Sequence, residues 1–141
     1  MELEEVDMES ISKQEKHIIM NQVGELIIRN VRDDALKISM DIVMGDTRNC
    51  IKKKQYSVLS DLTEGQKDAI CNLLSETVTD TIYRFLELFE EKSGDVKMTV
   101  NFEGKEYNIL DVSEKMGSEI AYDSPEGWIQ KYSKIGRVVL F

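Results

Sequence analysis

The chain has 141 residues, of which 41% are hydrophobic and 32% are charged, enough apolar material for the core of one domain. It carries 27 acidic and 18 basic residues, so its formal net charge is −9. A field of that sign repels phosphate, and direct binding of DNA or RNA is therefore not expected. A composition with one histidine and two cysteines excludes most zinc sites and histidine-based triads.

The N-terminus indicates a cytoplasmic protein. Its first ten residues hold five carboxylates and no basic residue, the opposite of a secretory signal. No apolar run approaches the roughly 18 residues that a membrane span requires. Cys71 lies in a helical pattern and Cys50 follows a polar turn, so we expect both thiols to stay reduced. We expect residues 1–10 to form a solvated acidic tail and residues 11–141 to form a single domain.

Residues 12–44 carry the first helical pattern. They include one glycine, no proline and apolar residues at steps of three and four. This pattern predicts one long helix, or two helices with a break near residues 32–34, where an aspartate would start the second. The apolar stripe consists of Ile19, Val23, Ile27, Val31, Ala35, Ile38 and Ile42.

The next element begins with a capping signal. Thr63 and Gln66 have the spacing of a capping box, and apolar residues then recur at helical steps until Ser93 and Gly94. The sequence therefore predicts a helix over residues 64–92. Together with the first pattern, it makes residues 11–92 the helical part of the domain.

Residues 95–141 are expected to form a small sheet part. Alternating apolar residues over 96–102 and again over 107–109 predict an antiparallel hairpin around a glycine-containing turn. A short helix that carries Met116 and Ile120 is expected to follow the hairpin.

The end of the chain leaves one alternative open. Residues 127–133 fit a short helix, because a serine and a proline precede them, and they also fit a strand. Residues 138–141 are expected to form a last strand. The predicted fold class is α+β, with helical N-terminal two-thirds packed against a small antiparallel sheet at the C-terminus.

Catalytic machinery is not expected. A Cys–His nucleophile would need His17 with Cys50 or Cys71, and no neighbouring group would activate the thiol. Nucleophile-elbow and phosphate-binding glycine motifs do not occur in the sequence. We predict no catalytic residue, metal or cofactor. One conceivable carboxylate site for magnesium, which is more typical of a solvated helix face, would use Asp33, Asp34, Asp41 and Asp46.

The predicted helix over 64–92 carries carboxylates at steps of four, seven and four residues, which places them along one ridge. Such a row is common on solvated helix faces, and it can also meet a basic surface and speed association by long-range attraction. We expect this ridge to bind and neutralise a basic protein, such as a toxin or a nucleic-acid-handling defence enzyme, as an immunity protein, antitoxin or inhibitor does. The ridge consists of Glu76, Asp80, Glu87 and Glu91.

Two other functions stay open. A small-ligand or nucleotide-binding module would use Lys52, Lys53, Lys54 and Arg84, with the aromatic side chains around Trp128. A structural protein would assemble with its own copy, as a homodimer, through the N-terminal apolar stripe.

Overall fold

The computed structural model describes residues 11–113, 115–120 and 127–135, and these form an α+β fold, as the sequence predicts. Most of them are helical, and one two-stranded antiparallel hairpin lies in the C-terminal part. In chain order the elements are α2 (Lys13–Ile27), the π-helical segment η1 (Ile28–Asp33), α3 (Asp34–Met44), α4 (Cys50–Gln55), the 3-10 helix η2 (Ser57–Asp61), α5 (Glu64–Glu91), β1 (Thr99–Phe102), β2 (Lys105–Asn108), α6 (Ile109–Val112), α7 (Met116–Glu119) and α8 (Trp128–Tyr132).

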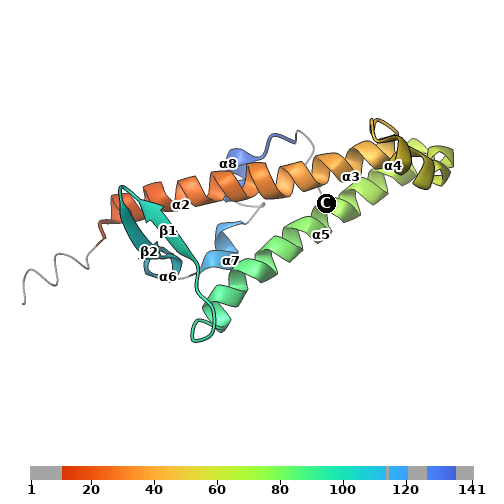
Figure 1. Ribbon diagram of the computed structural model, residues 1–141. Coiled ribbons are helices and arrows are strands. Elements are labelled where there is room, and N and C mark those ends of the chain that lie inside the picture. Colours follow the sequence, from red (N-terminus) through yellow and green to blue (C-terminus); the bar gives the residue numbers. More distant parts are fainter. Residues whose placement is uncertain (1–10, 114, 121–126, 136–141) are drawn as a thin grey trace, which may run out of the picture.

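Two antiparallel helical rods set the shape of the molecule (Figure 1). The first rod runs through α2, η1 and α3, and α5 returns beside α3. The rods diverge away from α4, and the hairpin, α6 and α7 fill the wedge between α2 and α5. Contacts of α7 with α5, and of α6 and α8 with α2, hold this wedge together.

Local signals fix the starts of the long helices. Ser12 caps α2, because its Oγ accepts a hydrogen bond from the backbone N–H of Glu15 (3.1 Å). At α5 the predicted capping box is present: the Gln66 N–H donates to Thr63 Oγ1 (3.1 Å), and the Thr63 N–H donates to Gln66 Oε1 (2.9 Å). Helix α5 ends at Glu91, one residue before the predicted end.

The first rod contains a π-helical turn where the sequence predicts a break near residues 32–34. A π turn holds more residues than an α turn, so it changes which side chains face inward after it. Ile19 of the predicted stripe is buried, but Val31 is 53% and Ile38 is 65% exposed, while Leu36 is buried instead. The prediction of one stripe on one face is therefore wrong from Val31 onward.

The hydrophobic core lies in the wedge between the rods. It draws on both rods and on all three short C-terminal helices, so the helical and sheet parts share one core. Its buried members are Ile19, Met20, Val23, Ile28, Ile82, Leu86, Ile109, Val112, Met116, Ile120, Trp128 and Ile129. Residues 128–132 form a helix, which decides between the two predicted alternatives.

The hairpin is shorter than predicted. Strand β1 starts at Thr99 rather than at residue 96, and a turn at Glu103 and Gly104, both with positive φ, leads into β2. The assignment of Ile109 to the returning strand is wrong, because Asn108 Oδ1 accepts a hydrogen bond from a backbone N–H of the next turn and caps α6 there. The predicted tail over 1–10 and the last strand over 138–141 lie outside the described residues.

Candidate partner-binding surface

The four predicted ridge residues project from one side of α5. Glu76, Asp80 and Glu91 are exposed and Glu87 is half-buried. Because α5 is a continuous helix over all four, their steps of four, seven and four residues place them along one stripe. The acidic ridge, defined by these residues, therefore exists as a geometric feature.

Intramolecular contacts engage the middle of the acidic ridge. Arg84 Nε lies 2.9 Å from Asp80 Oδ2, and this exposed ion pair raises the pKa of Arg84. The Tyr83 hydroxyl donates to Glu87 Oε2 (3.1 Å), and that hydrogen bond raises the pKa of Tyr83. Since an exposed ion pair contributes little net energy, Asp80 can still exchange Arg84 for an external cation.

The two ends of the acidic ridge are the carboxylates most open to a partner. Glu76 and Glu91 are exposed, and neither forms a hydrogen bond or ion pair with any residue that the structure describes. Between residues 76 and 91 the sequence has five carboxylates against one arginine. The C-terminal half of α5 is thus strongly acidic.

Helix α7 binds the carboxylate of Glu90, which lies beside the acidic ridge. The backbone N–H of Gly117 donates to Glu90 Oε1 (3.2 Å). A Cβ placed on Gly117 would lie 2.9 Å from Glu87 Cγ, so α7 approaches α5 closely at this point. The wedge therefore supports the acidic ridge at its C-terminal end.

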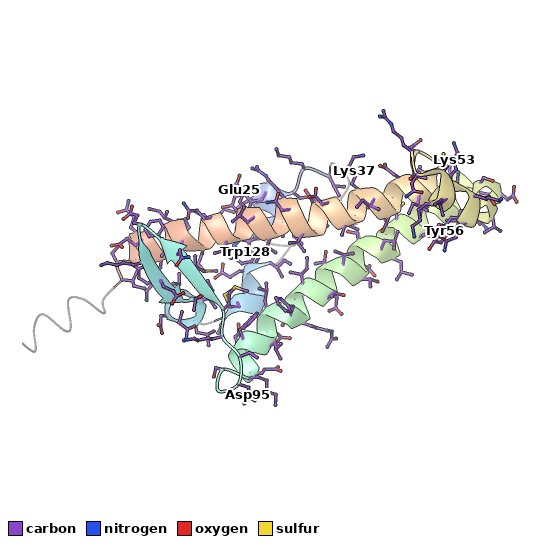
Figure 2. All side chains as sticks on the ribbon, in the orientation of Figure 1. Glu25, Lys37, Lys53, Tyr56, Asp95 and Trp128 are labelled. Atoms are coloured by element: carbon purple, nitrogen blue, oxygen red, sulfur yellow. The ribbon has the colours of Figure 1, made fainter. Side chains whose placement is uncertain are left out.

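The residues of the predicted small-ligand site do not come together. Lys52, Lys53 and Lys54 are exposed on α4, where Lys52 Nζ lies 5.9 Å from the centre of the Tyr56 ring. Arg84 lies 20 residues into α5, about 30 Å along the helix from the end near α4. Figure 2 shows Lys53 and Tyr56 at one end of the molecule and Trp128 far from them. Trp128 is also only 1% exposed, so it offers no ligand surface beside the lysines.

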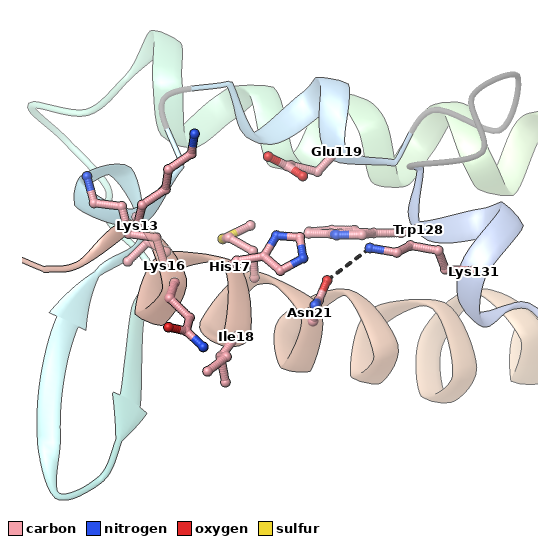
Figure 3. Close-up of a pocket in the computed structure, with 11 residues that line it drawn as sticks. Lys13, Lys16, His17, Ile18, Asn21, Glu119, Trp128 and Lys131 are labelled. Carbon is pink, nitrogen blue, oxygen red and sulfur yellow. Dashed lines mark hydrogen bonds between the residues drawn. The ribbon is translucent and has the colours of Figure 1, made fainter.

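A basic groove that the sequence analysis did not identify lies at the N-terminal end of α2 (Figure 3). Its volume is about 800 Å³, and Lys13, Lys16, His17 and Lys131 line it together with one carboxylate, Glu119. Lys131 reaches it from α8 and donates a hydrogen bond to Asn21 Oδ1 (3.1 Å). The signal was hard to find in the sequence because α8 lies more than a hundred residues from α2.

A buried polar network joins both rods to the C-terminal segment. Arg32, which is 1% exposed, donates to Asp33 Oδ1 (2.9 Å), Thr79 Oγ1 (3.1 Å) and Ser75 Oγ (3.1 Å). Ser133 Oγ also donates to Asp33 Oδ1 (2.9 Å). Burial lowers the pKa of Arg32, and the charge of Asp33 opposes that shift. Arg32, Asp33, Ser75 and Thr79 are buried and Ser133 is half-buried, so the network ties both rods to the C-terminal segment.

The other candidates for chemistry stand apart from one another. His17 lies near the N-terminal end of α2, whereas Cys50 lies on α4, beyond the other end of the first rod. Cys71 is buried on α5. Among the residues described, no cluster of histidine, cysteine and carboxylate side chains could hold a metal ion. Asp33 is committed to Arg32 and Asp41 to Lys37. Within the same ranges, no helix has the length and apolar character to cross a membrane.

The chain matches no protein-family model, no curated protein and no solved structure. Its functional assignment therefore rests on its own geometry and charge.

Proposed function

We propose that this chain is an acidic, non-catalytic binding protein that neutralises a basic macromolecule by covering its functional surface. The observation that supports this most directly is the row of carboxylates along α5, with Glu76 and Glu91 open at its two ends. A rigid helix that presents charges at fixed spacing can match cations on a partner and can steer its approach. A basic toxin or a nucleic-acid-handling enzyme has such a surface.

The experiment compares three proteins as baits in native lysate at low salt, with release by a salt gradient and mass spectrometry. The ridge variant Glu76→Lys/Glu91→Lys changes only the two carboxylates that have no partner in the described structure. The control variant Asp46→Lys/Asp61→Lys makes the same change in net charge at two exposed carboxylates that lie before the start of α5, away from the ridge. We expect the wild type and the control to retain one stoichiometric basic protein and the ridge variant to lose it. Equal retention by all three, or equal loss by both variants, would contradict the proposal.

One observation favours a second function, the binding of a small anion. The basic groove has Lys13 and Lys16 at one end and Lys131 at the other, against the single carboxylate of Glu119, in a protein of net charge −9. A ligand at a hundred times its Kd would add about 2.7 kcal/mol to the stability of the folded state. A thermal-shift series with inorganic phosphate and nucleotides tests this, and Lys13→Gln/Lys16→Gln should abolish any shift.

A further inference from the structure

The buried stripe of α5 divides its remaining surface into two unlike sides. The residues that immediately follow the buried positions are all polar: Asn72, Glu76, Asp80, Tyr83, Glu87 and Glu90. The residues that immediately precede the same positions are apolar except for one threonine. They are Ile70, Leu74, Val78, Thr81, Phe85 and Leu88.

The first rod shows the same division. Arg32, Leu36 and Val43 face inward, and each is preceded by an apolar residue. Those preceding residues are Val31, Ala35 and Ile42, and the exposed Ile38 lies one turn from the last two.

The apolar residues of the two rods lie on the same side. When two antiparallel right-handed helices pack side by side, each has a row of residues that faces the other helix. In both helices the residues that directly follow this row point to one side of the pair, and the residues that directly precede it point to the opposite side. The following side carries the acidic ridge and is covered only in places: the 133–134 segment bonds to Asp33, and α7 packs beside Tyr83 and Glu87. The preceding residues of both rods must therefore form the opposite side.

We call this opposite side the open apolar face: the six preceding residues of α5, of which Val78 also packs against the core, together with Val31, Ala35, Ile38 and Ile42. On it, Val31 and Phe85 are each 53% exposed and Ile38 is 65% exposed. Leu88 is 38% exposed. Val31 and Ile38 are on the first rod, and Phe85 and Leu88 are on α5 beyond the part that α3 contacts, because Arg32, just before α3, already bonds Ser75 and Thr79. The exposed side chains therefore extend past the α3–α5 contact.

We propose that a second copy of this chain covers the open apolar face, with the two helix pairs packed face to face about a two-fold axis as a four-helix bundle. A two-fold interface places a surface against itself, so a charged surface would repel its own copy. None of the ten residues of the open apolar face is charged, although the chain has a net charge of −9. Over residues 31–88, which hold the whole open apolar face, ten acidic and eight basic residues leave only −2 of the chain's net charge of −9, so little net repulsion opposes the approach of a copy.

The size of the open apolar face is sufficient for the centre of a dimer interface. From Ile70 to Leu88 it runs about 27 Å along α5. Over about the first 12 Å, from Ile70 to Val78, the two rods pack with axes about 8–10 Å apart and present a width of roughly 18 Å. Beyond that the rods diverge and α5 alone presents about 10 Å, so the flat area is about 370 Å². Flanking polar side chains would extend this toward the roughly 800 Å² per partner of a standard interface. Apolar steps of three and four residues on both helices also fit the packing of a bundle core.

Sedimentation velocity over a dilution series tests the proposal. We expect the wild type to reach twice its 16.2 kDa mass at high concentration and to dissociate on dilution. The face variant Ile38→Lys/Phe85→Glu, which leaves net charge unchanged, should stay monomeric with a wild-type circular dichroism spectrum. The control variant Ile51→Lys/Val58→Glu changes residues that are 77% and 71% exposed but lie outside the open apolar face, on α4 and η2, and it should still dimerise.

A wild type that stays monomeric throughout the series would overturn the proposal, and so would equal dissociation of the face variant and the control. If the face variant unfolds, Ile38→Ser/Phe85→Ser repeats the test with a smaller change, and the wild-type series stands by itself. The proposal is independent of the acidic ridge, which lies on the other side of α5. The monomeric face variant should therefore still capture a basic partner.

Discussion

The indole of Trp128 occupies the space where a side chain at Gly24 would lie. A Cβ placed on Gly24 would be 2.5 Å from both Cδ1 and Nε1 of that ring. Gly24 is in α2 and Trp128 is in α8, so the missing side chain lets α8 pack directly on the first rod. This contact closes one side of the core.

Replacing Gly24 with alanine should therefore destabilise the protein, although alanine is the better helix former. Overpacking of this kind costs about 1–3 kcal/mol. Urea unfolding measures it, with Gly65→Ala as the matched helical control, since the nearest neighbour of a Cβ there is Thr63 Oγ1 at 3.9 Å. Gly65→Ala should be neutral or stabilising. Equal effects of the two substitutions would contradict the role assigned to the Trp128 contact.

The buried ion pair between Arg32 and Asp33 makes a second prediction. Asp33→Asn leaves a guanidinium without its counter-charge in a closed site, which should cost roughly 3–5 kcal/mol. A double-mutant cycle with Arg32→Met measures the coupling, and the double variant should be more stable than the sum of the single losses predicts. The exposed pair Asp80–Arg84 provides a control, where Asp80→Asn should have little effect. Strict additivity at Arg32 and Asp33 would show that the pair is not coupled.

Tyr83 provides a prediction about pH. Its hydrogen bond to Glu87 raises its pKa above the ordinary value of 10.0. In the unfolded chain the phenol ionises near 10.0, so the stabilisation is fully present below that pH and is lost as pH rises through the higher folded pKa. Glu87→Gln should lower the titration midpoint of Tyr83, followed by tyrosinate absorbance and assigned with Tyr83→Phe. Glu91→Gln is the control, and a midpoint that Glu87→Gln leaves unchanged would contradict this account.

Local signals were predictable from the sequence, and long-range pairings were not. Thr63 and Gln66 determine the start of α5 within four residues, so the sequence alone predicts that helix and the ridge along it. The π turn in the first rod has no comparable local signature, and its change of phase moved Ile38 from a predicted core stripe to the surface. Apart from the adjacent Asp33, the partners of Arg32 are on α5 and in the C-terminal segment, and only the fold brings them together.

The same distinction between local signals and long-range pairings applies to the candidate binding surfaces. The spacing of Glu76 and Asp80 places them on one ridge of any helix, so the acidic ridge needed no tertiary information. The open apolar face could not be predicted from the sequence. The side to which Phe85 points depends on which residues of each rod are buried and on the antiparallel packing of the two rods. The basic groove needed Lys131 of α8 to lie beside α2.

The most direct test of the proposed function is the affinity of purified protein for the captured basic partner at low and at moderate salt. The account predicts that Glu76→Lys/Glu91→Lys weakens binding at low salt by at least about tenfold, because it reverses two charges that would contact the partner. Asp46→Lys/Asp61→Lys should change it by less than about threefold, and wild-type affinity should fall as salt rises. Equal affinities for all three proteins would show that the acidic ridge is not the binding surface.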